Sequence, residues 1–181
     1  MLKKASGLLV ISLLLALAGC GGGASKVDSG GVILEVGDFT QGLPIQVSAS
    51  ATTLPVIPTL TIHSILRDPT GTSSSLMDVT LDTLQVTFDR ADRGTRVPPA
   101  YVVRSPGFVP SNGTLNILNE PVMGNTQLNS QPFLDLRTYG LDRETGGAIA
   151  TLNCHLTYFG KTLSGKTVQS EPFSWTMEVL P

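Results

Sequence analysis

Hydrophobic and polar residues alternate along most of this chain. From Val32 onward, short stretches place an apolar side chain at every second position, which is the period of a β-strand with one buried face. No stretch of twelve or more residues carries the apolar stripe of an amphipathic helix. The pattern predicts an all-β fold with strands near residues 32–36, 45–49, 60–66, 79–88, 101–104, 114–118, 148–159 and 168–179.

The alternation changes phase once inside its strongest segment. Three positions separate Leu81 from Leu84, whereas two or four would keep both side chains on one face of a strand. A β-bulge, or a strand that moves from one sheet to another, would account for this shift near Asp82 and Thr83.

Prolines are concentrated between Val97 and Pro132, which hold half of the twelve in the chain. Because proline cannot donate a hydrogen bond to a strand ladder, this region is expected to form edge strands and loops. Residues 111–113, with the sequence Ser-Asn-Gly, predict a turn between two of these strands.

In the C-terminal third, strict alternation places Cys154 on the same face as Leu152, Leu156 and Tyr158. We predict that Cys154 is a buried thiol acting as a small hydrophobe, with His155 on the opposite face of its strand. The last segment alternates in the same way, and its apolar face contains Phe173, Trp175, Met177 and Val179.

Seven to nine short strands separated by turns predict a single antiparallel β-sandwich. Residues 156–168 contain the aromatic–glycine pair Phe159–Gly160, a polar turn with Gly165, and Val168 ahead of the final strand. This segment resembles the last hairpin of immunoglobulin-like and fibronectin-III-like modules in bacterial surface proteins. The resemblance implies an immunoglobulin-like sandwich over residues 32–181, although the paired cysteines of antibody domains are absent.

The N-terminus has the three-part layout of a secretory signal peptide. Lys3 and Lys4 precede an apolar run over residues 7–18, which is too short for a helix that crosses a bilayer. The run ends in Leu17, Ala18, Gly19 and Cys20, which resemble the lipobox of bacterial lipoproteins. The resemblance implies that the Cys20 thiol receives a diacylglycerol, the chain is cut before it, and the new amine is acylated. The alternative is an ordinary cleaved signal followed by an incidental cysteine.

These features divide the chain into three parts: a signal peptide over residues 1–19, a lipidated cysteine and Gly/Ser-rich tether over 20–31, and a β-sandwich domain over 32–181. A flexible tether of this length has an end-to-end distance of roughly 18 to 20 Å. These features predict that the protein is located in the cell envelope and is anchored to the membrane through lipid on Cys20. Because Gly21 follows the cysteine, we expect the outer membrane if the host has two membranes.

Charge argues against a nucleic-acid partner. Without residues 1–19, ten basic side chains face fourteen acidic ones, and the arginines are dispersed among acids. The densest group is Arg90, Arg93 and Arg96, which alternates with Asp89 and Asp92 and predicts a solvated turn.

The sequence predicts no catalytic or metal-binding motif. The two histidines, His63 and His155, lack the spacing of zinc or copper ligands and are interpreted as surface or sheet-packing residues. No nucleophile motif, phosphate loop or cofactor fingerprint occurs, so we expect neither an enzyme nor a cofactor. Weak calcium binding by Asp142 with Glu144, or by Asp89 with Asp92, is the alternative to solvated turn acids.

Tyr101 and Phe108 are the best candidates for a binding surface, because aromatic side chains on rigid loops give contact area at low entropic cost. The alternative is that both cap the sandwich core. The function that we predict is a non-catalytic one, in which a lipid-anchored envelope protein binds a protein partner for scaffolding or adhesion. A carbohydrate-binding module of the envelope is the alternative.

Overall fold

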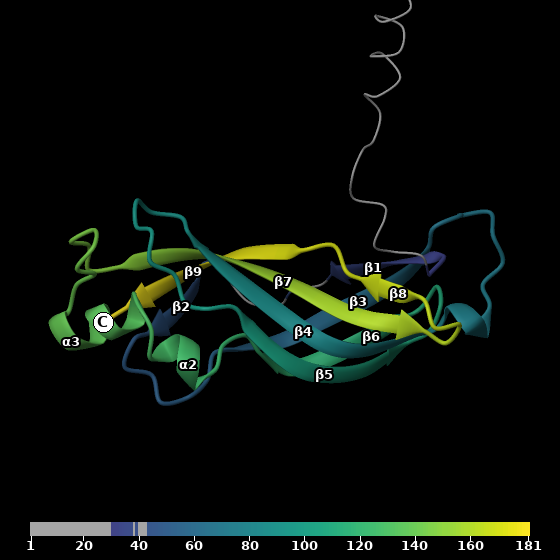
Figure 1. Cartoon of the computed structure of the whole chain (residues 1–181), viewed down its shortest axis with the longest axis horizontal. Coiled ribbons are helices and arrows are strands. Elements are labelled where there is room, and N and C mark those ends of the chain that lie inside the picture. The colour runs from purple at the N-terminus through teal and green to yellow at the C-terminus, as the bar shows by residue number, and fades with distance from the viewer. Residues whose placement is uncertain (1–29, 38, 40–42) are drawn as a thin grey trace, which may run out of the picture.

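The computed structural model describes residues 30–37, 39 and 43–181. The predicted processing motif, Leu17, Ala18, Gly19 and Cys20, lies outside these residues, as does most of the predicted tether. The described chain is mainly β (Figure 1). Its elements are β1 (Val32–Gly37), β2 (Ile45–Ser48), β3 (Val56–Leu66), η1 (Ser75–Met77), β4 (Val79–Arg90), β5 (Tyr101–Val109), β6 (Thr114–Pro121), α2 (Asn125–Leu128), α3 (Phe133–Tyr139), β7 (Ala150–Thr162), β8 (Thr167–Gln169) and β9 (Phe173–Leu180).

The strands form two sheets. The smaller sheet has the order β1–β3–β6, and the larger has the order β2–β9–β7–β4–β5 with β8 beside the second half of β7. All these neighbours are antiparallel except β2 and β9, which run parallel. One hydrophobic cluster receives side chains from both sheets, so the sheets enclose a common core.

The core follows from the alternation in the sequence. In β7, every second side chain from Ala150 to Tyr158 is fully buried, and Cys154 is one of them, as predicted. In β9, Trp175, Met177 and Val179 are buried, while the side chains between them are more exposed. A buried apolar side chain of this size contributes about 1.5 to 3 kcal/mol relative to an exposed one, so these two strands supply a large share of the stability.

The predicted irregularity in β4 is a β-bulge. Leu81 lies opposite Gly160 and Thr83 opposite Phe159 of β7, which leaves Asp82 without a counterpart. Prolines of the region 97–132 lie at sheet edges, as predicted. Pro106 lies in β5 at the edge of the larger sheet, and Pro121 ends the edge strand β6. The predicted turn at residues 111–113 separates these two strands.

The chain is not entirely β, which corrects the all-β prediction in one region. Two short helices, α2 and α3, follow β6. Phe133 and Leu136 occupy one face of α3 and are fully buried, and Gly140 ends the helix in the left-handed conformation with φ of 70°. Because α3 has only seven residues, it is too short to show a stripe in a twelve-residue window.

A second correction concerns the predicted strand over residues 168–179, which is two strands. At the break, Ser170 is fully buried, and its backbone N–H donates to the Tyr158 carbonyl. The next N–H, of Glu171, donates to Leu34 in β1, and Pro172 has no N–H to donate. The chain thereby touches β1 before β9 pairs with the first half of β7.

Candidate functional site

A groove lies on the outer face of the larger sheet, the face turned away from the core. It encloses about 620 Å³ and is open to solvent. We call it the outer groove, and its lining residues are Thr80, Asp82, Phe159, Gly160, Lys161, Thr167, Val168 and Gln169. The groove crosses β4, β7 and β8, which lie in the front of the view in Figure 1.

Strand pairing brings the groove's side chains together. Residues paired across antiparallel strands point to the same face, so Phe159 shares the outer face with Gln169, and Lys161 with Thr167. The bulge adds Asp82 to this face, where its side chain is exposed. A Cβ on Gly160 would lie 2.4 Å from the Thr80 carbonyl oxygen, so only glycine permits the close approach of β7 and β4 here.

The groove combines an aromatic ring with groups that form hydrogen bonds. Phe159 is half-buried, and the carboxylate of Asp82, the ammonium of Lys161 and the amide of Gln169 are the polar groups near it. Arg104 of β5 approaches Asp82 at 3.9 Å, with both side chains exposed to water. This set can hold a ligand through ring contacts, hydrogen bonds and opposite charges.

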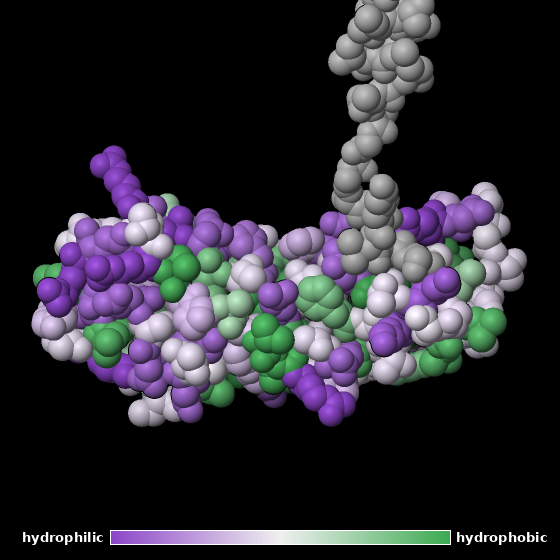
Figure 2. Space-filling view, in the orientation of Figure 1, coloured by the Kyte–Doolittle hydropathy of each residue, from purple (hydrophilic) through white to green (hydrophobic). Residues whose placement is uncertain are grey.

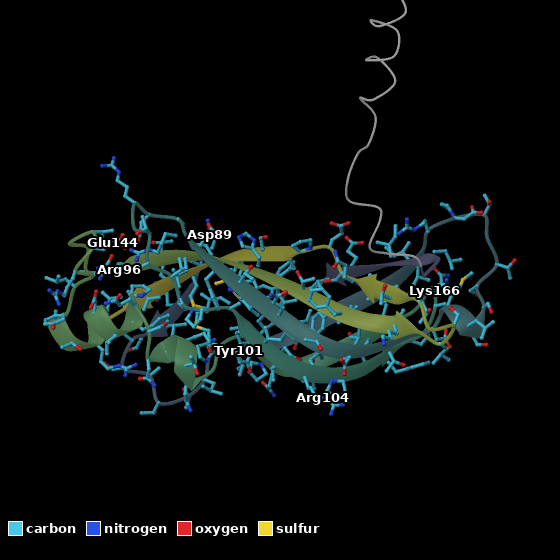
Figure 3. The ribbon with its side chains drawn as sticks, viewed as in Figure 1. Asp89, Arg96, Tyr101, Arg104, Glu144 and Lys166 are labelled. Atoms are coloured by element: carbon cyan, nitrogen blue, oxygen red, sulfur yellow. The ribbon has the colours of Figure 1, made fainter. Side chains whose placement is uncertain are left out.

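The two aromatic residues proposed from sequence lie in different environments. Phe108 is 49% exposed and pairs with Thr80, so it stands on the outer face next to the outer groove. Tyr101 is half-buried and packs against the core, and its ring is 3.2 Å from the position that a Cβ on Gly124 would take. Seven residues of β-strand separate them by roughly 23 Å. Figure 3 shows Tyr101 and Arg104 along this strand.

A row of polar side chains crosses β4, β7 and β9 on the same face, and no motif in the sequence indicates it. His155 Nε2 lies 2.5 Å from Asp89 Oδ1, and its Nδ1 lies 2.7 Å from the hydroxyl of Ser174. Asn153 donates to the other Asp89 oxygen at 2.9 Å. The hydrogen bonds from Asn153 and His155 lower the pKa of the Asp89 carboxyl.

This row has the residue types of a catalytic triad but not its surroundings. Asp89 and Ser174 are exposed, and the His155 side chain is 36% exposed. Hydrogen bonds that activate a nucleophile are effective where water is excluded, whereas this row is open to solvent. We therefore interpret it as a connection between three strands. Cys154, behind it, faces the core, and burial raises the pKa of its thiol to about 12.

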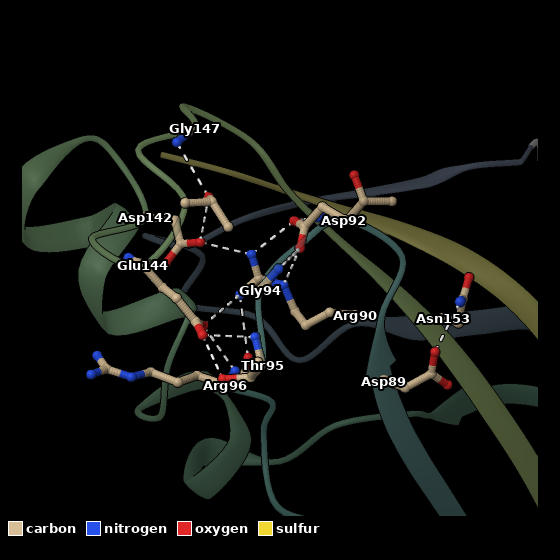
Figure 4. Close-up of polar contacts among 12 residues, drawn as sticks. Asp89, Arg90, Asp92, Gly94, Thr95, Arg96, Asp142, Glu144, Gly147 and Asn153 are labelled. Carbon is tan, nitrogen blue, oxygen red and sulfur yellow. Dashed lines mark hydrogen bonds and ion pairs between the residues drawn. The ribbon is translucent and has the colours of Figure 1, made fainter.

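The predicted solvated turn around Arg90 is wrong, because the Arg90 side chain is only 2% exposed. Its guanidinium donates to Asp92 at 2.7 and 2.8 Å and to Asp142 at 2.7 Å (Figure 4). Burial raises the pKa values of Asp92 and Asp142, but the hydrogen bonds from Arg90 and from backbone N–H groups outweigh it and hold both below their usual range. Arg93 and Arg96 are exposed, as predicted.

The same network bears on the calcium alternative for Asp142 and Glu144. One Asp142 oxygen accepts from the N–H of Glu144, and the other accepts from Arg90 and Thr145. Glu144 accepts from the N–H groups of Thr95 and Arg96 at 2.8 and 2.9 Å (Figure 4). Oxygens of both carboxylates thus already accept hydrogen bonds within this network, and these acids connect two loops.

In residues 30–37, 39 and 43–181, no three side chains of His, Cys, Asp or Glu converge closely enough to hold a metal ion. Among the same residues, no helix has the length and apolar character needed to cross a membrane. No protein-family model matches this chain, and no curated protein matches its sequence.

Proposed function

We propose that this chain is a lipid-anchored binding protein of the cell envelope, held at the membrane through Cys20 and acting without catalysis. Its β-sandwich presents the outer groove to a partner protein, in a scaffolding or adhesion role. The observation that carries the proposal is the outer groove itself, a preformed hollow of about 620 Å³ beside an open sheet edge. Ligand sites are usually concave and preformed in this way.

The surroundings of the groove favour a protein partner. On the edge strand β5, Val102 and Phe108 are 60% and 49% exposed, and the Arg104 side chain between them is 83% exposed. Apolar side chains around an arginine are the composition of protein-binding surfaces. Figure 2 shows this face as a mixture of hydrophobic and hydrophilic surface.

Strand order supports an immunoglobulin-like sandwich as the form of the fold. The order β1–β3–β6 corresponds to strands A, B and E of that fold, and β9–β7–β4–β5 corresponds to G, F, C and C′. The correspondence also preserves the order of the strands along the chain. The helices α2 and α3 replace a direct connection between E and F.

Site-specific photo-crosslinking in the native host tests the protein partner. A photoreactive residue at Phe108 is expected to capture a specific envelope protein, and the charge reversal Lys161→Glu is expected to weaken the capture several-fold. The matched control is the same photoreactive residue at Ile149, which is 47% exposed but lies in the loop between α3 and β7. Capture from Ile149 and not from Phe108 would contradict the assignment of the site.

A carbohydrate ligand is the second candidate, because Phe159 lies in the groove beside the acid Asp82 and the amide Gln169. An aromatic ring with adjacent hydrogen-bonding groups can hold a sugar. A glycan array with the wild-type protein and with Phe159→Ala separates the candidates. Binding lost in the variant would favour a glycan, whereas an empty array together with a crosslinked protein would remove that candidate.

The anchor has its own test. Replacing Cys20 with alanine is expected to release the protein from membranes or to leave an uncleaved precursor. Unchanged size and membrane location of Cys20→Ala in fractionation would contradict lipidation. Mass spectrometry of the mature N-terminus identifies the acyl chains directly.

A further inference from the structure

The described chain begins at one end of the elongated sandwich. The Gly31 carbonyl accepts from the N–H of Arg67, and a Cβ on Gly31 would lie 3.5 Å from Met77 in η1. The C-terminus lies at the opposite end (Figure 1). We call the end that contains η1 and the β7–β8 turn over residues 163–166 the anchor-side tip.

Two leucines protrude from the anchor-side tip. Leu76 is 60% exposed and Leu163 is 54% exposed. The segments that carry them are joined by backbone hydrogen bonds, from the Leu163 N–H to the Asp78 carbonyl at 2.9 Å and from the Ser164 N–H to the Leu76 carbonyl at 3.0 Å. These bonds join the backbone of the β7–β8 turn to that of η1 and the residue after it, and Figure 2 shows hydrophobic surface at this end.

Positive charge accompanies the leucines. Lys161 and Lys166, the two lysines of the described chain, flank Leu163, and Figure 3 shows Lys166 at the tip. Arg67 lies in the neighbouring turn with Asp68. Asp78, another acid near the tip, accepts a hydrogen bond from the N–H of Ser111, and Asp82 lies with Lys161 in the outer groove. Exposed leucines next to lysines are the composition of surfaces that enter the interface of anionic bilayers.

Chain length sets how far this tip can be from an anchored cysteine. Only ten residues lead from Cys20 to Gly30, so they span at most roughly 33 to 36 Å. If Cys20 is embedded in the bilayer, the anchor-side tip is the part of the sandwich nearest to the lipid.

We propose that the anchor-side tip rests on the lipid surface, with Leu76 and Leu163 in the bilayer interface and Lys166 against anionic headgroups. This inference rests on the proposed lipidation of Cys20. It orients the molecule, because the end with α3 and the Arg90 network then points away from the membrane. The outer groove, on the side of the sandwich, stays open to a partner in the aqueous layer.

Fluorescence quenching by lipids tests the contact in the full-length, lipidated protein. One fluorophore is placed on Ser164→Cys at the tip and, as the matched control, on Tyr139→Cys at the opposite end, where Tyr139 is 55% exposed. The native Cys154 is buried and does not compete for label. The vesicles contain phosphatidylethanolamine and phosphatidylglycerol, with a nitroxide on a fraction of the lipids.

We expect several-fold stronger quenching at position 164 than at position 139. The double substitution Leu76→Ser and Leu163→Ser should reduce quenching at 164 to the level at 139, while the protein still floats with the vesicles. Both leucines are exposed, so the fold is expected to persist, and circular dichroism checks it. Lys166→Gln should weaken quenching in anionic vesicles only.

The two proposals fail in different ways. Wild-type protein that does not float with vesicles contradicts the lipid anchor. Protein that floats, but whose label at 164 is quenched no more than that at 139, overturns the contact while leaving the anchor intact. Capture of a protein by a crosslinker at 164, without quenching, would assign the tip to a protein partner instead and likewise overturn the proposal.

Discussion

Arg90 and Asp142 form an ion pair of 2.7 Å in which the side chains are only 2% and 1% exposed. The pair connects the end of β4 to the loop between α3 and β7, 52 positions further along the chain. Asp92 completes the contacts of the guanidinium from the other side. The loops at this end of the sandwich are thus held by a buried charge network.

Removing the charge of Arg90 is expected to destabilise the protein. Arg90→Met leaves two carboxylates without their partner, and breaking a buried ion pair typically costs 3 kcal/mol or more, so we expect a loss of about 3 kcal/mol in the free energy of unfolding. Urea denaturation measures it. The matched control is Arg104→Met, whose pair with Asp82 is exposed and should contribute less than about 1 kcal/mol. Equal losses of unfolding free energy in Arg90→Met and Arg104→Met would contradict the larger contribution of the buried ion pair.

Because the Glu120 carboxyl is buried, we expect the stability of the protein to depend on pH. Burial raises the pKa of its carboxyl above the ordinary value of 4.5, although Ser105 donates a hydrogen bond to it. When pH rises above about 4.5, the unfolded state releases this proton first, so the stability that Glu120 provides at low pH is lost as pH rises towards the folded-state pKa. Glu120→Gln cannot ionise and should lack this loss.

The measurement compares the free energies of unfolding of wild type and Glu120→Gln near pH 4 and near pH 7. The variant should gain relative to wild type at the higher pH. Glu171→Gln, at an exposed position, serves as control and should show no such gain. A constant difference between Glu120→Gln and wild type at both pH values would show that the carboxyl has the same affinity for protons in both states.

Gly160 is expected to resist substitution, because the added Cβ of Gly160→Ala would collide with the backbone of Thr80 at 2.4 Å. We expect a loss of about 1 to 3 kcal/mol, as for other overpacked sites, together with altered binding at the outer groove. Gly165→Ala isolates the conformational cost, since its φ is 83° but its Cβ would meet no atom within 4 Å. Its loss should be about 1 kcal/mol. A smaller loss at Gly160 than at Gly165 would refute the steric argument.

The Cys154 thiol is expected to be unreactive in the folded protein. It is fully buried in β7, and burial, followed by the negative charge of Asp89, raises its pKa to about 12. A thiol-specific reagent near pH 8 should therefore label Cys154 only after unfolding in urea, because the thiolate is the reactive form. Tyr139→Cys provides an exposed thiol as positive control. Rapid labelling of native Cys154 would mean that β7 opens.

Several elements were predictable because their signals are local. Alternation located the buried faces of β7 and β9, and the three-residue step between Leu81 and Leu84 located the bulge. The period of a strand and its interruption are properties of adjacent residues, so they can be recognised without knowledge of the partner strand. The helix α3 was missed because its apolar face consists of one turn.

The candidate site was much less predictable. Of the two aromatic residues proposed from sequence, the structure places only Phe108 beside the outer groove. In the sequence, Phe159, the aromatic residue of the groove, belongs to an aromatic–glycine pair typical of a hairpin. Its exposure to the groove was not predictable, because it depends on where β8 pairs with β7. Arg90 looked solvated because its partner Asp142 is distant in sequence.

The order of adjacent residues was enough to identify the mainly β character of the chain, the inward faces of its longest strands and the position of the bulge. Which charges are buried, which polar side chains meet across β4, β7 and β9, and where a groove opens became evident only in the folded molecule. Burial alternates along a single strand, whereas ion pairs and grooves require segments from distant parts of the chain to come together.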